Sequence, residues 1–377
     1  MLQELVAISA FMAVWAVLFL LYKFLGLRRY GFSFKPLVLI AKSKRIAEKL
    51  ENAGYAVSKP WKVVTSIGAV ISGSLMVFAF YVLLSNLLVR FTTPTTQAGL
   101  YVVIPGLTIG WDATPYFLLA AAITIVVHEL FHALSFGSEG VPLRGFGVFF
   151  AVLLPGGFVE ADNEAFNSSR PRSKMRIYAA GSFSNFMVYL VATALIALTV
   201  VPAGVLVIET VEGYPAHGAL IGGDVIISIN GFSVQSVGDL DRILSQISPE
   251  SEIYVEILRN GSRMTLPLVT VPSPTGGSKP MIGVKISDYY SSPIPWLTGQ
   301  AYWHWFSSLY WIQLVSFSVA MINMLPIPLL DGSGFLKALL EATLKGEKRK
   351  QLGELMINLA SFTSLFLLIA NIVAPLI

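Results

Sequence analysis

Six stretches of the chain are apolar over about the length that crosses a bilayer, which is roughly 20 mainly apolar residues for a helix. They cover residues 5–25, 64–88, 114–134, 177–200, 303–325 and 355–376. Between the fourth and the fifth stretch, residues 204–287 instead alternate apolar and polar positions between turns, as half-buried strands do. The pattern therefore predicts a polytopic α-helical membrane protein with about six transmembrane helices and a small α+β domain inserted between the fourth and fifth helices.

Composition agrees with a protein that resides in the lipid bilayer. Of 377 residues, 55% are hydrophobic and 13% are charged, far from the usual balance of soluble domains. The net charge of +4 is not gathered into a basic stripe with interleaved aromatic residues, so nucleic acid is not an expected partner. The chain has no cysteine, which excludes disulfides, thiolate metal sites and cysteine nucleophiles.

Basic residues are unevenly distributed among the loops. Residues 28–62 hold nine of the 26 Lys and Arg residues, and residues 144–176 and 337–350 hold five each, whereas residues 91–115 hold none. Cytoplasmic loops carry the excess of positive charge. We therefore expect these three loops in the cytoplasm, and both termini and the inserted domain outside it, in a multi-pass protein of the cell membrane. The first stretch lacks a basic leader and a cleavage signal, so we expect it to be retained as a span.

Chemistry is concentrated in the third stretch, which ends in His128-Glu129-Leu130-Phe131-His132. An H-E-x-x-H run on a helix places two imidazoles one turn apart, where both can bind one Zn²⁺. The glutamate between them can then act as general base toward a water that the metal activates. Ionisable groups inside a membrane segment are costly and usually functional. Since two of the four histidines fall in this run, we predict a metal site with Glu129 as the base.

A second polar element, residues 323–332, reads Asn-Met-Leu-Pro-Ile-Pro-Leu-Leu-Asp-Gly at the end of the fifth stretch. Two prolines break the helix there, and broken backbone at membrane depth is tolerated where it lines a cavity. Asp331 follows at the same expected depth as His132, near the cytoplasmic face. Because a catalytic zinc needs three protein ligands, we predict Asp331 as the third. A glutamate from a downstream E-x-x-x-D helix is the alternative, as in other zinc peptidases.

The two elements together resemble the site-2 protease family of intramembrane zinc metalloproteases. The resemblance covers residues 114–377 and implies that His128, His132 and Asp331 hold zinc and that Glu129 activates water. Residues 181–185, Gly-Ser-Phe-Ser-Asn, resemble the family's G-P-x-x-N element with Ser182 in place of proline. Asn185 would then lie near the site and bind substrate, unless it makes an ordinary contact between helices. Asn323 either binds substrate or braces the broken helix.

Two further segments resemble parts of PDZ-containing members. The glycine-punctuated residues 143–160 resemble a re-entrant β-hairpin whose edge pairs with an unwound substrate, although a buried structural hairpin is equally consistent. Within the insert, Gly-Asp-Val-Ile-Ile-Ser-Ile-Asn-Gly at residues 223–231 resembles a circularly permuted PDZ domain, and Asn260-Gly261 predicts a hairpin turn. This PDZ-like domain would gate substrate access, bind a peptide carboxyl terminus, or act as a spacer.

The sequence thus predicts four segments. Residues 1–113 form two N-terminal helices with a basic loop, residues 114–203 and 288–377 form the two halves of the protease core, and residues 204–287 form the PDZ-like domain. The expected function is hydrolysis of a peptide bond in or near the transmembrane segment of single-span membrane-protein substrates, near the cytoplasmic face. The alternative functions are a non-catalytic scaffold that binds partners through the PDZ-like domain, and an ion-coordinating transporter, which would need an internal repeat that we do not find.

Overall fold

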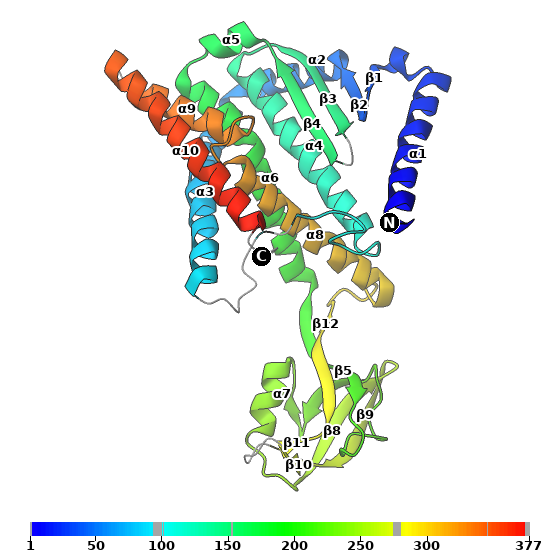
Figure 1. Ribbon diagram of the computed structural model, residues 1–377. Coiled ribbons are helices and arrows are strands. Elements are labelled where there is room, and N and C mark those ends of the chain that lie inside the picture. The colour runs from blue at the N-terminus through cyan, green and yellow to red at the C-terminus, as the bar shows by residue number, and fades with distance from the viewer. Residues whose placement is uncertain are drawn as a thin grey trace. The chain divides into compact units, whose positions relative to one another are not determined.

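The computed structural model describes residues 2–92, 100, 102–151, 154–273, 280–344 and 346–373 (Figure 1). Contacts divide the chain into two compact units. One comprises Met1–Thr193 together with Ser307–Ile377, and the other comprises Ala194–Phe306. The first unit holds most of the long helices, and the second holds the strands that follow the fourth apolar stretch.

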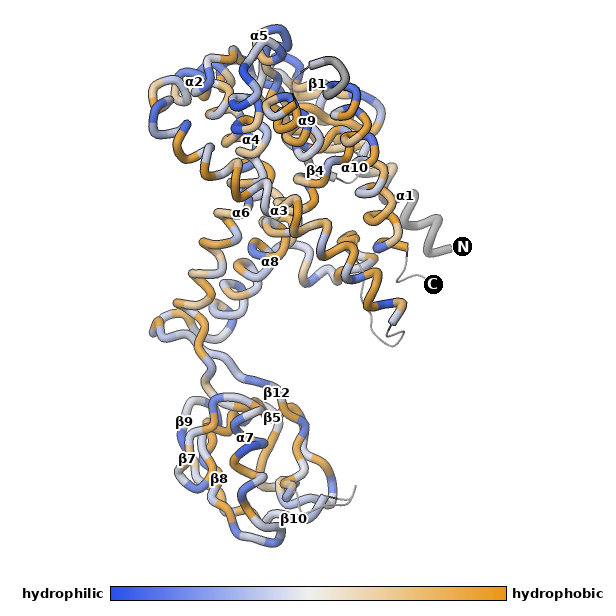
Figure 2. The backbone as a smooth tube through the Cα atoms, turned by 90° about the vertical axis from the view of Figure 1, so that its left-hand side faces the viewer, coloured by the Kyte–Doolittle hydropathy of each residue, from blue (hydrophilic) through white to orange (hydrophobic). Residues whose placement is uncertain are grey.

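Long helices form where the sequence is continuously apolar, and hydrophobic residues run along them in Figure 2. Within the described residues, five helices are long and apolar enough to cross a membrane. They are α3 (Ser58–Thr92), α4 (Thr114–Glu139), α6 (Pro171–Thr199), α8 (Gly299–Asn323) and α10 (Glu347–Val373). The first apolar stretch lies in α1 (Leu2–Phe24), whose described apolar part, Trp15–Phe24, is shorter than a span. A sixth transmembrane helix therefore stays a prediction.

Small and hydroxylated residues bring the long helices together. Gly68 in α3 leaves room for the Phe183 ring of α6, since a Cβ there would lie 2.7 Å from the ring. The buried Ser72 Oγ donates to the Ala179 carbonyl 3.1 Å away, between the same two helices. Close packing of small residues and interhelical hydrogen bonds commonly stabilise contacts between membrane helices, because in lipid no hydrophobic effect drives their association. They fix α6 against α3.

A short helix in the first basic loop, α2 (Lys44–Ala56), crosses the polar end of α4 at close range. A Cβ on Gly54 would lie 2.3 Å from the Leu134 carbonyl oxygen, and one on Gly137 would lie 2.3 Å from that of Glu51. The two glycines therefore allow backbone contact between the helices. Ser43 caps α2 by accepting from the Ile46 amide.

Four antiparallel strands form one sheet in the order β1-β2-β3-β4. The strands β3 (Leu143–Ala151) and β4 (Leu154–Ala161) form the predicted hairpin of residues 143–160. The strands β1 (Phe32–Lys35) and β2 (Val38–Ser43), which we did not predict, extend it on the β3 side. Consequently β4 is an edge strand of this sheet. It lies next to α4, and its outer edge has no partner among the described strands. The short helix α5 (Asn163–Ser168) follows it.

The Pro-containing segment after α8 turns the chain into a separate helix, α9 (Asp331–Thr343). Leu329 has a φ of +77° within this turn. Gly332 lies so close to the end of α8 that a Cβ would be 2.1 Å from the Met324 carbonyl oxygen. Only glycine fits this position, which explains the Asp-Gly pair. The turn places Asp331 at the first residue of α9.

The second unit contains an antiparallel sheet in the order β12-β5-β6-β8-β9, with the short β7 (Phe232–Ser233) paired to β6. Its other strands and helix are β5 (Val201–Thr210), β6 (Val225–Ile229), α7 (Val237–Leu244), β8 (Glu252–Arg259), β9 (Ser262–Val269), β10 (Val271–Pro272), β11 (Pro280–Met281) and β12 (Val284–Ser291). The predicted Asn260-Gly261 turn joins β8 to β9, both residues having positive φ. Alternate residues of the strands, such as Ile253, Val255 and Ile257, form its core.

Candidate metal centre

The helix α4 presents His128 and His132 on one face, with Glu129 beside them. Both histidines are 7% exposed. The histidines point toward α6 and the start of α9, because positions i and i+4 lie on the same side of a helix. The H-E-x-x-H motif thus stands on a long apolar helix, as the sequence predicts.

Asp331 completes a cluster of three potential ligand atoms. Its Oδ2 lies 3.2 Å from His128 Nε2 and 3.1 Å from His132 Nε2, and the two imidazole nitrogens are 3.1 Å apart. Within the described part of the chain, His128, His132 and Asp331 are the group of His, Asp and Glu side chains that could hold a metal ion. The structure therefore brings together the three predicted ligands and gives no support to a glutamate ligand from a later helix.

The spacing of these atoms fits a tetrahedral metal. Ligands at about 2.0–2.1 Å from zinc in a tetrahedron lie roughly 3.3 Å from one another, close to the separations in the cluster. Gly181 of α6 closes one side, since a Cβ there would lie 2.4 Å from both Nε2 atoms. The residues present therefore fit a zinc ion, and a larger residue at position 181 would obstruct the cluster.

Hydrogen bonds orient both imidazoles so that Nε2 is directed into the cluster. His132 Nδ1 is 2.9 Å from the Ile177 carbonyl oxygen, which can only accept, so Nδ1 carries the proton and Nε2 has a free lone pair. His128 Nδ1 lies 3.0 Å from the Asn185 side-chain amide.

The Asn185 amide explains how the second histidine is held. Asn185 is fully buried and its Oδ1 has no hydrogen-bond partner among the described residues, while Nδ2 faces His128. An amide rotated by 180° occupies the same space and places Oδ1 where it accepts from Nδ1–H. That arrangement satisfies the buried oxygen and leaves His128 Nε2 free for a metal. Asn185 thus contacts a ligand, and its predicted contact with substrate stays a prediction.

The carboxyl group of Asp331 faces both imidazoles with one oxygen, since Oδ2 lies within 3.2 Å of each Nε2 atom. An ionised carboxylate is the form that binds a metal. The cluster therefore offers two neutral nitrogens and one negative oxygen.

A cavity of about 340 Å³ opens beside the cluster. Glu129, Asn323 and Tyr178 line it, together with Phe158 and Val159 of the edge strand β4. Gly157 of β4 packs directly on the base, since a Cβ there would lie 2.3 Å from Glu129 Cγ. The cavity thus has a candidate general base, two side chains that can donate hydrogen bonds, and on its border a strand with one free edge among the described strands.

Sequence reasoning missed Tyr178 and Gly157. A lone tyrosine in an apolar stretch usually indicates an interfacial anchor. Tyr178 is instead held in the cavity by α9, where a Cβ on Gly334 would lie 2.2 Å from its ring. The spacing Tyr178-x-x-Gly181-x-x-x-Asn185, which puts all three on one side of α6, was the available signal.

Two further side chains near the cluster are Phe131 of α4 and Ser182 of α6, the residue that replaces the proline of the family pattern. The Phe131 ring packs against Trp61 of α3 at a centroid distance of 5.0 Å, so its bulk contributes to the contact between α3 and α4. Ser182 is buried, and its Oγ has no hydrogen-bond partner among the described residues. The remaining histidines, His217 and His304, belong to no group of potential metal ligands in the described residues.

Comparison with known proteins identifies the family. A model described as Peptidase family M50 matches residues 116–369. The chain belongs to peptidase family M50. A membrane-bound transcription factor site-2 protease homolog of Arabidopsis thaliana is 33% identical over 140 residues, which are 34% of this chain and 27% of that protein. The predicted kinship with site-2 proteases is therefore confirmed, and this M50 member is a multi-pass membrane protein of a metalloprotease family.

Two other similarities cover different lengths of the chain. An uncharacterized protein of Methanocaldococcus jannaschii is 26% identical over 369 residues, which are 94% of this chain and 92% of that protein. The PDZ domain of the SdrC-like protein from Listeria monocytogenes is 18% identical, with a TM-score of 0.21, over 22% of this chain and 87% of that domain.

Proposed function

We propose that this M50 protein is a zinc endopeptidase that hydrolyses a peptide bond in or near the membrane span of a single-span protein. The observation that carries the proposal is the cluster of His128 Nε2, His132 Nε2 and Asp331 Oδ2, with mutual distances of 3.1–3.2 Å, beside Glu129 on a helix of membrane length. In zinc peptidases, a glutamate between two histidine ligands acts as the general base toward the attacking water.

Each residue of the cavity has a defined task in this reaction. Zinc held by His128, His132 and Asp331 would supply Lewis acidity toward the scissile carbonyl and the attacking water. Glu129 accepts the proton of that water and then donates it to the leaving amine nitrogen. Asn323 and Tyr178 can donate hydrogen bonds to the carbonyl oxygen as negative charge develops on it. Asn185 holds His128 in the required tautomer.

A substrate helix must unwind before its backbone reaches this cavity, because helical amides are hydrogen-bonded and shielded. The edge strand β4 supports a way to stabilise the unwound form, since β4 borders the cavity and has a free edge among the described strands. An extended peptide added to β4 would satisfy its backbone there. Substrates with helix-breaking residues near the cleavage site should therefore be preferred.

The charge pattern of the loops supports placing the metal centre near the cytoplasmic face and the insert outside the cytoplasm. The insert supports a PDZ-like role through the Gly-Asp run in its sequence and through α7 beside the edge strand β12, where the Val237 amide donates to Asp288 Oδ1. We propose that it selects substrates, either as a gate or by binding a carboxyl terminus.

The experiment compares wild-type protein with Glu129→Gln, using Glu164→Gln in the exposed helix α5 as the matched control. Model single-span substrates, with and without a Gly-Pro pair in the span, are mixed with purified enzyme in detergent, and bound zinc is measured in the same samples. We expect all three proteins to bind zinc and only Glu129→Gln to lose cleavage. Near-wild-type turnover by Glu129→Gln, or no zinc in active wild-type protein, contradicts the proposal.

A further inference from the structure

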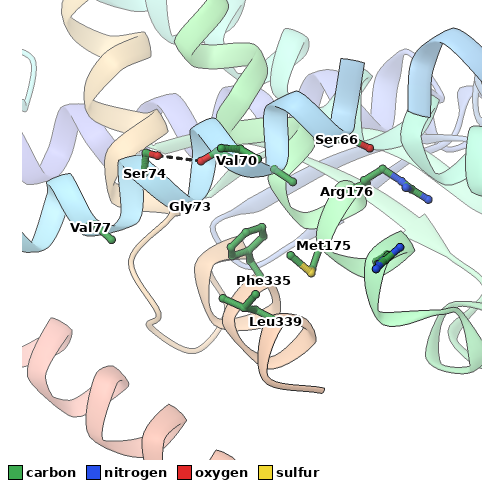
Figure 3. Close-up of a pocket in the computed structure, with 11 residues that line it drawn as sticks. Ser66, Val70, Gly73, Ser74, Val77, Met175, Arg176, Phe335 and Leu339 are labelled. Carbon is green, nitrogen blue, oxygen red and sulfur yellow. Dashed lines mark hydrogen bonds between the residues drawn. The ribbon is translucent and has the colours of Figure 1, made fainter. Parts of the chain in front are cut away.

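A second and larger hollow lies away from the metal centre, between α3, α6 and α9 (Figure 3). Its volume is about 750 Å³, within the range of small-molecule sites. Ala69, Val70, Gly73 and Val77 of α3 form one wall, and Phe335 and Leu339 of α9 form another. The groove belongs to the first compact unit and shares no lining residue with the metal cavity.

The body of this groove is suited to a hydrocarbon chain. Val70 and Val77 are 71% and 70% exposed, although they lie on a helix of membrane length. The two serines on the wall do not make it polar, because Ser66 Oγ donates to the Lys62 carbonyl and Ser74 Oγ to the Val70 carbonyl within α3. Their hydroxyl groups therefore need no water, and the surface presented by α3 is apolar.

One end of the groove is basic. In Figure 3, Ser66 and Arg176 lie at one end and Val77 at the other. Arg176 donates from Nε to Glu139, which leaves this pair near neutral. Arg172, one turn earlier on α6, is exposed and has no ion-pair partner within the described residues. It lies at the second residue of α6, where a membrane helix reaches the headgroup region.

We propose that this groove binds one anionic phospholipid, with the phosphate at Arg172 and an acyl chain along α3 toward Val77. Basic pockets between membrane helices bind acidic lipid headgroups, whereas a purely apolar groove accepts any lipid tail. The uncompensated charge of Arg172 at one end and the apolar wall beyond it match both parts of such a molecule. A protein helix or a second copy of the chain would match only the apolar wall.

The bound lipid would also contact the helix that carries a metal ligand. Phe335 and Leu339 lie one and two turns after Asp331 on α9, and positions i, i+4 and i+8 share a face. An acyl chain against these two side chains fills the space between α3 and α9. A lipid bound in the groove should therefore reduce local unfolding of α9, although it makes no contact with the metal centre.

Two variants separate the headgroup from the tail. Arg172→Gln removes the proposed phosphate contact, with Arg45→Gln on the exposed face of α2 as the matched loss of charge. Gly73→Leu fills the groove, because a Cβ at Gly73 would lie 3.6 Å from the Phe335 ring, an ordinary contact that needs no shift of backbone. Zinc content and thermal unfolding of each variant show whether it is folded.

The full chain is reconstituted with phosphatidylcholine and phosphatidylglycerol, and the lipids retained after extraction are counted by native mass spectrometry. We expect wild type and Arg45→Gln to retain one phosphatidylglycerol in preference to phosphatidylcholine. Arg172→Gln should lower that preference about fivefold, since one basic residue near an anionic headgroup contributes about 1 kcal/mol. Gly73→Leu should lose both lipids, and excess glycerol phosphate should displace neither. Phosphatidylglycerol should slow amide hydrogen exchange in α9 of the wild type and should leave exchange in α9 of Gly73→Leu unchanged.

Three results would overturn the proposal. The first is an equal preference for phosphatidylglycerol in wild type and in folded Arg172→Gln. The second is lipid retention that persists in folded Gly73→Leu. The third is a dimer without retained lipid, which would mean that a second copy of the chain covers the groove.

Discussion

Replacement of Gly181 by alanine tests whether the three-atom cluster is a metal site shaped by the backbone of α6. The added methyl carbon would lie 2.4 Å from His128 Nε2 and from His132 Nε2. Carbon and nitrogen atoms in contact stay about 3.5 Å apart, so each distance is short by about 1 Å. Either α6 moves away from α4 or the imidazoles rotate. Both changes exceed the tolerance of about 0.2 Å in metal–ligand distances. We therefore expect Gly181→Ala to weaken zinc binding by about tenfold to hundredfold.

The assay is competition between the purified protein and a chromophoric zinc chelator in detergent, together with thermal unfolding at increasing zinc concentration. Gly353→Ala is the matched control, because it also adds a methyl group to a long helix, and its Cβ would lie 3.4 Å from the flexible Leu344 side chain. Zinc should raise the unfolding temperature of wild type and Gly353→Ala by mass action, and raise that of Gly181→Ala much less. Equal zinc affinity in Gly181→Ala and wild type would refute the assignment of the cluster as a metal site.

Three further predictions concern the surroundings of the site, the insert and the topology. Asn185→Ala should lower zinc affinity about tenfold by releasing His128, whereas Asn185→Asp, which keeps an acceptor, should restore much of it; equal affinities in all three proteins would contradict a positioning role. In the insert, Arg259 donates two hydrogen bonds to Asp224, from Nε to Oδ1 and from Nη2 to Oδ2. Burial raises the pKa of Asp224, but these hydrogen bonds lower it below the usual value. The stability that Asp224 contributes is therefore present above about pH 4 and is lost as pH falls through the lowered pKa. Asp224→Asn should destabilise the insert by about 3 kcal/mol at neutral pH and should reduce the loss of stability on acidification, both measured by hydrogen exchange of β6. An unchanged pH dependence of stability in this variant would be evidence against the contribution of the pair. A single cysteine at exposed Asn167 should be shielded from a membrane-impermeant thiol reagent in intact cells and one at exposed Ser262 should be labelled, and the reverse pattern would invert the topology.

The features that the sequence predicted well depend on neighbouring residues along the chain. The long helices follow from continuous apolar runs, and the β8–β9 hairpin follows from Asn260-Gly261, which tolerate positive φ. The helix α4 needs only its 3.6-residue period to place both histidines on one face. The pairing with Asp331, 199 residues beyond His132, was predicted from chemistry, since a zinc needs a third ligand and few ionisable residues lie in the apolar stretches.

The features that the sequence did not show depend on contacts between distant segments. The helix α2 lies in a basic stretch that reads as a loop, and its position depends on the close approach of Gly54 to the backbone of Leu134. The strands β1 and β2 join the sheet through β3, which lies far along the chain: Ile40 pairs with Phe149, 109 residues later. The hydrophobic periodicity of a segment indicates its secondary structure but does not identify the distant segment with which it pairs. The helix α9 was missed because the two prolines before it indicated an end of regular structure.

Three glycines allow backbone segments to approach the metal cluster or the residues that support it. A Cβ on Gly181 would meet the imidazoles, one on Gly157 would meet Glu129, and one on Gly332 would meet the end of α8 behind Asp331. Each glycine therefore brings a different backbone, from α6, β4 or α9, to within contact distance of the site or its support. The space that remains is the cavity bordered by Tyr178 and Asn323. If a substrate pairs with the free edge of β4, as proposed above, substitutions that block this edge should inhibit cleavage while leaving zinc bound.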